Sequence, residues 1–388
     1  MNSCRADMRR LTAFNSPPMV TAENADLEYM ARALALAERG RGLTSPNPMV
    51  GAVVVKSGVV VGEGYHRQAG AAHAEVEALA AAAERAREAT LYVTLEPCVH
   101  HGRTPPCVPA VIEAGIRRLV VAVQDPNPQV NGRGIAALRR AGCLVLVGSM
   151  ADAAREQNRA FFVYMAARRP LVTLKAAMTL DGKIAAWDRN SRWITGEPAR
   201  LLVHRMRSES DAIAVGIGTV LQDDPELTVR LPSPWPREPY RIVVDSHCRI
   251  PLDARVLRAG RPERTLVVTT EGAPVEKVRA LEARGVALLR LPSRDGRVDL
   301  SALLFRLGAL EVTALLLEGG SELNAAFLES GLVDRVKLFV APIFLGGRDS
   351  PGPVGGAGRS IKEAFRLRGV TVRRVGEDFL IEGDLTRC

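Results

Sequence analysis

The 388-residue chain is longer than one hydrophobic core usually serves, so we expect two domains of roughly 150 to 200 residues each. Its apolar fraction of 47% is ordinary for a globular protein, and no apolar run approaches the roughly 18 residues of a membrane span. The net charge of +9 suits a nucleic acid or a phosphorylated ligand, but aromatic residues are only 4% and the arginines are scattered, which disfavours a nucleic-acid partner.

The N-terminal 23 residues contain arginines but no apolar segment followed by a small-residue cleavage site, so we expect an extension and not a signal peptide. The chain has six cysteines, which are sparse and unevenly spaced. Such spacing argues against a disulfide framework and favours a reducing compartment. We therefore expect a cytoplasmic protein.

The first half of the chain alternates helical patterns with short apolar runs. The expected helices cover residues 26–39, 74–87, 108–114, 135–141 and 151–162. The expected strands cover residues 51–55, 91–95, 119–123 and 144–147. The first of these continues through a turn at Lys56-Ser-Gly58 into a further strand. This alternation predicts a layered α/β domain, to which we assign residues 24–168.

Arg168-Arg169-Pro170 marks a boundary, after which long β-branched runs begin. The expected strands cover residues 171–176, 212–216, 241–244, 265–269, 314–317 and 335–340. The expected helices cover residues 198–208, 274–284, 299–308 and 321–330. We interpret residues 169–388 as a second α/β domain with its own sheet.

One histidine, two cysteines and one glutamate in the first half have the spacing of a catalytic zinc site. His73 and Glu75 begin an expected helix, Cys98 follows a strand, and Cys107 opens the next helix. Three protein ligands leave the fourth tetrahedral position for water, whereas a structural zinc site normally has four. Glu75 can then move a proton from the activated water to a departing amine. This is the H-x-E then P-C arrangement of zinc deaminases, with a structural zinc or no metal as the alternative.

Three segments of the second half place glycine near the end of an apolar run. Residues 171–183 predict a strand and a turn at Asp181-Gly182, and Gly216-Ile-Gly218-Thr219 is a weak sign of a phosphate loop. Glu318-Gly319-Gly320 is a better one, because it follows an apolar strand and precedes a helix, where backbone N–H groups can approach a phosphate. Any one of these segments alone is equally consistent with an ordinary turn.

The eight residues between Cys98 and Cys107 make the resemblance more specific, because the general deaminase pattern has two. The segments NPMVGAVVV, GEGYHRQAGAAHAE, TLEPCVHHGRTPPC and QDPNPQVNGRG resemble the deaminase domain of the bifunctional riboflavin-biosynthesis deaminase/reductase family. The segments LKAAMTLDGK, SRWITG, HRMRSESDAIAVGIGTVLQDDPELTVR, VVDS and LEGGSELNAAFL resemble its reductase domain, a relative of dihydrofolate reductase. The resemblance extends from about residue 25 to the C-terminus.

The resemblance implies a cytidine-deaminase-like three-layer α/β/α domain followed by a dihydrofolate-reductase-like α/β domain. It implies that zinc is bound by His73, Cys98 and Cys107, and that Glu75 is the catalytic proton shuttle. It implies NADPH contacts from Ala177, Trp193, Thr219, Asp223, Ser246, Gly320, Ser321, Glu322, Leu323, Asn324, Ala325 and Ala326. It implies substrate contacts from Ser191, Arg207, Leu227, Arg230 and Glu318. Lys175 is a further candidate, as a proton donor or polarising group.

The implied substrate is a small phosphorylated pyrimidine, 2,5-diamino-6-(5-phosphoribosylamino)pyrimidin-4-one, which is deaminated and then reduced by NADPH to 5-amino-6-(5-phosphoribitylamino)uracil. Arg207 and Arg230 can make bidentate bonds to its sugar phosphate, although each taken singly can equally be a surface charge. The resemblance also suggests a homo-oligomer formed through the second domain. Two alternatives are a nucleic-acid base deaminase with an RNA-binding second domain and a non-catalytic zinc-stabilised scaffold.

Overall fold

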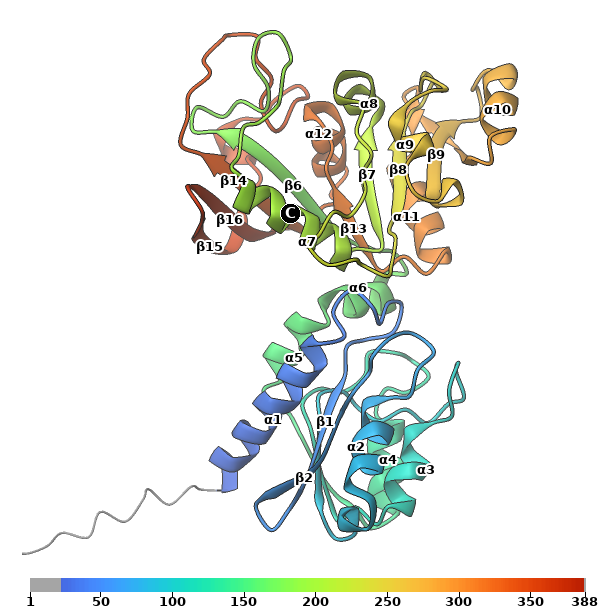
Figure 1. Ribbon diagram of the computed structural model, residues 1–388, viewed down its shortest axis with the longest axis vertical. Helices are drawn as coiled ribbons and strands as arrows, with labels where there is room; N and C mark the ends of the chain where they lie inside the picture. Colours follow the sequence, from blue (N-terminus) through green and yellow to red (C-terminus); the bar gives the residue numbers. More distant parts are fainter. Residues whose placement is uncertain (1–21, 387–388) are drawn as a thin grey trace, which may run out of the picture.

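The computed structural model describes residues 22–386, which form two α/β domains, one above the other in Figure 1. The helices α5 (Ala151–Gln157) and α6 (Arg159–Ala167) lead from the lower domain to the upper one. Residues 1–21 of the expected N-terminal extension lie outside the described residues, and Ala22 already begins a helix. Within residues 22–386, no helix is both long and apolar enough to cross a membrane.

The sheet of the first domain has five strands in the order β2-β1-β3-β4-β5. β1 is antiparallel to β2 and to β3, whereas β3, β4 and β5 run parallel. The strands are β1 (Gly51–Lys56), β2 (Val59–Tyr65), β3 (Thr90–Val93), β4 (Arg118–Val121) and β5 (Leu144–Val147). The carboxyl ends of β3 and β4 therefore meet at one edge of the sheet.

Alternating side chains along β1 build a core on each face of this sheet. Ala52 and Val54 belong to one core, and Val53 and Val55 belong to the other. The first core is covered by α2 (Ala74–Ala82), α3 (Cys107–Glu113) and α4 (Arg133–Arg140), and the second by α1 (Ala22–Glu38), α5 and α6. The result is the expected three-layer α/β/α domain.

The second domain is organised around a nine-stranded sheet in the order β10-β9-β8-β7-β13-β6-β14-β16-β15. In this order, each strand from β10 across to β14 is parallel to its neighbours. β16 is antiparallel to β14, and β15 is antiparallel to β16. The strands are β6 (Leu171–Thr179), β7 (Ala212–Gly216), β8 (Tyr240–Val244), β9 (Thr265–Thr270), β10 (Ala287–Leu291), β13 (Ala314–Leu317), β14 (Arg335–Ala341), β15 (Leu367–Val375) and β16 (Asp378–Leu385). A separate short hairpin consists of β11 (Ser293–Arg294) and β12 (Arg297–Val298).

Helices cover both faces of this sheet. On one face, α11 (Leu300–Ala309) and α12 (Ser321–Glu329) pack against the sheet, and their side chains Leu303 and Phe327 belong to the same hydrophobic core. The opposite face packs against α7 (Glu197–Glu209), α8 (Ile217–Asp223), α9 (Arg255–Arg258) and α10 (Val275–Glu282). The parallel strands are thus buried on both faces, which explains their continuous apolar runs.

The structure differs from the expected elements in three ways. The helix expected over residues 151–162 is interrupted at Asn158. The side chain of Asn158 accepts a hydrogen bond from the backbone N–H of Met49, at 2.7 Å, and donates one to the carbonyl oxygen of Met49, at 2.8 Å. The helix expected over residues 74–87 ends at Ala82 and continues as a short 3₁₀ turn, η1 (Ala83–Ala86). The sequence analysis missed α8, α9, β10, β11, β12, β15, β16 and the 3₁₀ turns η2 (Pro262–Arg264) and η3 (Ile361–Glu363).

Candidate active sites

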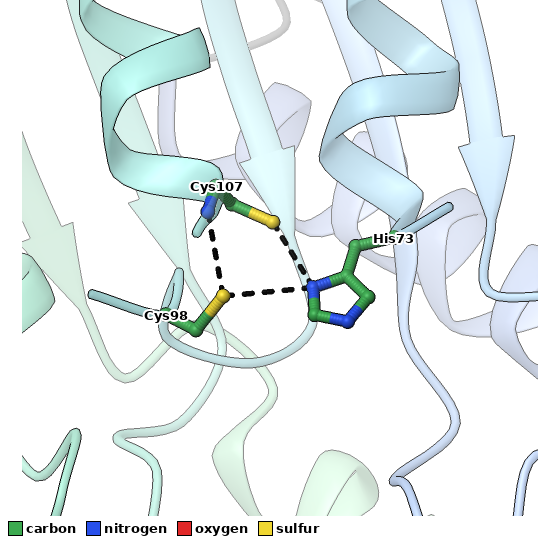
Figure 2. A group of neighbouring side chains, drawn as sticks. All are labelled: His73, Cys98 and Cys107. Carbon is green, nitrogen blue, oxygen red and sulfur yellow. Dashed lines mark hydrogen bonds between the residues drawn. The ribbon is translucent and has the colours of Figure 1, made fainter. Parts of the chain in front are cut away.

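The zinc-ligand candidates converge at the starts of two neighbouring helices. His73 immediately precedes α2, Cys107 is the first residue of α3, and Cys98 lies in the loop after β3. Their ligand atoms all lie within 4.8 Å of one another, and Figure 2 shows the three side chains pointing toward one another. A set of three leaves one tetrahedral position open, as in catalytic zinc sites.

Contacts around His73 determine which ring nitrogen faces the cysteines. Nδ1 lies 3.1 Å from Sγ of Cys107 and 3.5 Å from Sγ of Cys98, whereas Nε2 lies 3.0 Å from Oγ1 of Thr104. A bond from Nε2–H to Thr104 selects the tautomer whose Nδ1 is free to bind a metal. Thr104 lies in the eight-residue spacer, and the sequence analysis missed it because the motif marks only the cysteines.

The pKa values of the two cysteines shift in opposite directions. A hydrogen bond from Cys107 stabilises the thiolate of Cys98 and lowers its pKa to about 4, and the backbone N–H of Cys107 also donates to this sulfur, at 3.3 Å. The bond to Cys98, together with burial, raises the pKa of the Cys107 thiol. A dication between the two sulfurs would displace that proton. Two sulfurs and one imidazole nitrogen are a donor set that fits zinc.

Glu75 lies in the first turn of α2 and is only 3% exposed. Burial raises the pKa of its carboxyl group, and the negative charge of Cys98 raises it further. The side chain adjoins Cys107, so it faces the group of metal-ligand candidates. A buried carboxylate with a raised pKa accepts a proton more readily than an exposed one, as a proton shuttle requires.

Glu96 holds the loop that carries Cys98. Its carboxylate accepts four hydrogen bonds, at 2.9 to 3.2 Å, from backbone N–H groups of residues 125–135. Gly134 packs so closely that a Cβ there would lie 2.0 Å from the carbonyl oxygen of Pro97. The sequence analysis named Glu96 only as part of the motif, because its partners lie about 30 residues further along the chain.

A buried charge cluster lies at the carboxyl end of β13 in the second domain. The guanidinium of Arg207 donates to both carboxylate oxygens of Glu318, at 2.6 and 3.0 Å, and Nζ of Lys175 lies 3.7 Å away. Burial alone would raise the pKa of Glu318, but the charges of Arg207 and Lys175 outweigh it and lower the pKa to about 2. Burial lowers the pKa of Lys175. Arg207 is therefore engaged by Glu318 and is not a free surface cation.

The starts of α8 and α12 lie side by side at this edge of the sheet. Neither helix has a side-chain cap, so backbone N–H groups at both starts are available to a ligand. A Cβ on Gly319 would lie 2.8 Å from Oδ1 of Asn324, and one on Gly320 would lie 3.4 Å from Oγ1 of Thr219. Two uncapped helix starts at the carboxyl ends of parallel strands fit a dinucleotide phosphate.

Ser191 and Asp223 are direct neighbours, at 3.0 Å between Oγ and Oδ1. The structure thus joins one predicted substrate residue to one predicted cofactor residue. Arg192 donates to the backbone carbonyl of Asp223 and ties the same two segments together. The ring of Trp193 is 67% exposed and lies against the guanidinium of Arg200.

The predicted cofactor residues of α12 are only partly available to a ligand. Ser321 and Asn324 donate to backbone carbonyls of the loop after β14, and Ala325 is buried. Leu323 packs beside Gly319, and a Cβ on Gly355 would meet the carboxylate of Glu322. Ala326 is half-buried against the core. The backbone at the start of α12, more than its side chains, is therefore available to a ligand.

Ala177 and Ser246 lie on either side of this helix pair. Ala177 is on β6 and packs against the core beneath α7, whereas Ser246 follows β8 and accepts a bond from the backbone N–H of Val298 at 3.1 Å. These two positions are separated in the sheet by β7 and β13. They can contact one ligand only if it extends along the carboxyl edge.

Leu227 and Arg230 lie in the segment after α8. Leu227 is 3% exposed, and Arg230 is exposed and pairs with Glu226 at 2.9 Å. The backbone N–H of Arg230 donates to Nδ1 of His204, at 3.1 Å. Burial, and then the charges of Arg207 and Arg230, lower the pKa of His204 to about 4. The sequence analysis missed His204, because a single histidine in a helical segment carries no signal of its own.

These features define a zinc-dependent deaminase domain joined to a reductase domain. Residues 23–123 match the family described as the cytidine and deoxycytidylate deaminase zinc-binding region, and residues 170–381 match the family described as the RibD C-terminal domain. The chain belongs to the RibD family of riboflavin biosynthesis proteins. It is a bifunctional enzyme with deaminase and reductase activities that uses zinc and NADPH.

Relatives and solved structures match nearly the whole chain. It is 45% identical to riboflavin biosynthesis protein RibD of Actinobacillus pleuropneumoniae, over 92% of this chain and 94% of the relative. It is 46% identical to the protein of the same name from Aquifex aeolicus, over 92% of this chain and 97% of the relative. RibD of Acinetobacter baumannii superposes with a TM-score of 0.86 at 37% identity, covering 94% of this chain and all of that one. These matches confirm the predicted deaminase-like and reductase-like fold classes.

Proposed function

We propose that His73, Cys98 and Cys107 bind the zinc ion and that Glu75 is the proton shuttle of the deamination. The observation that carries this assignment is the convergence of three ligand atoms within 4.8 Å, with a buried carboxyl group beside them. When bound, zinc activates a water molecule at neutral pH. Glu75 accepts a proton from that water and delivers it to the departing amine.

The proposed substrate is 2,5-diamino-6-(5-phosphoribosylamino)pyrimidin-4-one. A solved protein from Thermotoga maritima is described as a diaminohydroxyphosphoribosylaminopyrimidine deaminase/5-amino-6-(5-phosphoribosylamino)uracil reductase. It has a TM-score of 0.80 at 34% identity and covers 94% of this chain. Ammonia leaves in the first reaction, and the second reduces the ribosyl chain to give 5-amino-6-(5-phosphoribitylamino)uracil.

In the second domain, the twelve residues named in the sequence analysis are the proposed NADPH contacts. The proposed substrate contacts are Ser191, Arg207, Leu227, Arg230 and Glu318. NADPH supplies the hydride, and the chain orients both reactants. The Glu318 carboxylate holds Arg207 and Lys175 on one side of the site, where two cations favour a phosphorylated substrate. Lys175 is the proposed proton donor or polarising group of this step.

A chelation experiment tests this division of labour. Removal of zinc from the full chain should abolish ammonia release from the diaminopyrimidine and leave NADPH oxidation on the deaminated intermediate unchanged. Zinc added back in equal amount should restore ammonia release. Ammonia release by zinc-free protein would contradict the proposed metal site.

We also infer a domain boundary near residue 168, a cytoplasmic location and self-association through the second domain. The boundary is supported by the end of α6 at Ala167 and the start of β6 at Leu171. Self-association is supported by β15, an edge strand whose Val370 and Val372 are more than half exposed. Light scattering of the full chain measures its mass, and a monomer at all concentrations would contradict self-association.

A further inference from the structure

A loop of the first domain, residues 42–49, is held by the second domain. Oγ of Ser45 donates to Oδ2 of Asp211 at 2.8 Å, and the guanidinium of Arg237 donates to the carbonyl oxygen of Gly42 at 3.0 Å. Arg237 also forms an ion pair with Asp211. The two residues of the second domain that bond Gly42 and Ser45 are therefore partners of each other. The loop is therefore attached at two points three residues apart.

Asp211 is itself held firmly, so it provides a fixed point for the loop. It is 4% exposed and accepts hydrogen bonds from the backbone N–H groups of Thr313 and Ala314, at 2.6 and 3.0 Å. Thr313 precedes β13 and Ala314 begins it, and Glu318 follows the last residue of the same strand. The carboxylate of Asp211 is thus part of the rigid sheet of the second domain.

Close packing leaves the loop little freedom to move. Gly42 has a φ of +75°, and a Cβ there would lie 2.6 Å from the carbonyl oxygen of Ser208 and 2.9 Å from a ring carbon of Trp235. Both of these residues belong to the second domain. At the other end of the loop, Asn158 bonds both backbone groups of Met49.

The same loop reaches the zinc-ligand candidates through the half-buried side chain of Asn47 and the buried side chain of His66. Nδ2 of Asn47 lies 3.0 Å from Nε2 of His66, and Nδ1 of His66 lies 3.1 Å from the carbonyl oxygen of Ala72. His66 is 2% exposed, and its ring packs edge-on against the ring of His73, with centroids 5.2 Å apart and planes at 84°. His66 thus contacts His73 directly and also bonds the backbone of the preceding residue.

We infer that Asp211 is a positioning residue for the deaminase, although it belongs to the reductase domain. Through Ser45 it fixes the loop that carries Asn47, Asn47 fixes His66, and His66 fixes the ring of His73. The deaminase site then has its full geometry only while the two domains are in contact. Misplacement of a catalytic group by about 1 Å can lower a rate by up to about 100-fold, so small movements of this loop affect catalysis.

The test uses Ser45→Ala in the full chain, because this change removes the contact and leaves the bonds of Asp211 inside its own domain intact. Ser45→Thr retains a hydroxyl group. The matched control is Arg335→Gln, which removes another ion pair between the domains, to Glu156 at 2.7 Å, and leaves the hydrogen bonds of Ser45 and Asn47 in place. The measurements are kcat and KM of both reactions, zinc content, and the visible absorption bands of the Co²⁺-substituted proteins.

We expect Ser45→Ala to lower kcat of deamination about tenfold and to shift the Co²⁺ bands, because the His73 ring moves. Reductase kcat and a zinc content of one ion per chain should not change, and Ser45→Thr and Arg335→Gln should behave as the wild type. Unchanged deamination and unchanged bands in Ser45→Ala would overturn the inference, as would an equal loss of both activities. The inference rests on the proposed role of His73, and zinc content tests that role separately: a His73→Ala protein that keeps its zinc would refute the ligand assignment.

Discussion

The two sites are assembled from very different lengths of chain. The proposed deaminase site takes four side chains from residues 73–107, at the starts of two neighbouring helices and in the loop after β3. The proposed reductase site takes its charged cluster from Lys175 on β6, Arg207 on α7 and Glu318 directly after β13. Two further helix starts without side-chain caps lie at the same edge of the sheet.

This difference shows where the chemistry of each site resides. A metal site needs particular donor atoms in one place, so single side chains are indispensable there. The reductase site binds a cofactor that carries the chemistry, and it relies on backbone groups and a buried charge network. A single substitution in the metal site should therefore abolish deamination, whereas a single substitution in the reductase site should only weaken reduction.

Loss of a zinc ligand should have the largest effect. Cys98→Ser removes the thiolate, and we expect zinc content to fall well below one ion per chain and ammonia release to disappear. Reductase activity on the deaminated intermediate should remain, because His73, Cys98 and Cys107 all lie in the first domain. Metal analysis together with an ammonia assay checks this. Full zinc content with normal deamination would exclude Cys98 from the site.

Glu75→Gln should separate metal binding from proton transfer. The amide cannot accept a proton, so deamination should fall about 10³-fold, within the range of general acid–base catalysis. Zinc content should be unchanged, because Glu75 is not a proposed ligand. Reduction of the deaminated intermediate should proceed normally. Retained deamination in this variant would rule out the proton-shuttle role.

Glu318→Gln should weaken the second domain and reveal a pH dependence. The pKa of Glu318 is about 2 in the fold against an ordinary value of 4.5, so its ionised form stabilises the fold above about pH 4.5, and this contribution is lost as the pH falls toward 2. We expect the variant to lose about 3 kcal/mol of unfolding free energy at pH 7, because Lys175 and Arg207 lose their partner.

Denaturant unfolding of both proteins at several pH values measures this loss. The gap between wild type and variant should shrink as the pH falls from 4.5 toward 2. A suitable control is Asp152→Asn, which changes a fully exposed carboxylate paired with Arg155 and should leave stability unchanged. A gap that is the same at every pH would contradict the assignment of the stabilising charge to Glu318.

Arg207→Ala should have the smallest of these effects on activity, and it also leaves the buried carboxylate of Glu318 without its bidentate partner. It removes one cation of the proposed substrate site, and we expect the KM of the reduction to rise about tenfold, by roughly the free energy of one charge-assisted hydrogen bond. Deamination should be unaffected. Steady-state kinetics of the two reactions provide the measurement. An unchanged reductase KM would remove Arg207 from the substrate site.

The sequence predicts that the candidate zinc ligands lie together, because His73, Cys98 and Cys107 are the donor types that the chemistry demands. Helix and strand patterns place His73 and Cys107 at helix starts and Cys98 after a strand. The contacts that hold them are not predictable in this way. Glu96 bonds backbone groups about 30 residues away, and His66 depends on a loop that the second domain holds. Such contacts arise only when the chain folds.

The reductase site is less visible in the sequence. The glycines before α12 predict its uncapped start, but they do not reveal that Asn324 bonds the loop after β14. The C-terminal hairpin of β15 and β16 was missed because β15 is largely exposed and rich in arginine, without a continuous apolar run. Its position at the sheet edge accounts for this composition.

The central claim is that one chain deaminates the diaminopyrimidine at its zinc site and then reduces the product at a separate site. The most direct measurement incubates the full chain with this substrate, with and without NADPH, and follows ammonia and NADPH together. Ammonia should appear in both cases, and NADPH oxidation should begin only after ammonia release, in equal final amount. Oxidation of NADPH without ammonia release, or ammonia release only when NADPH is present, would contradict the account.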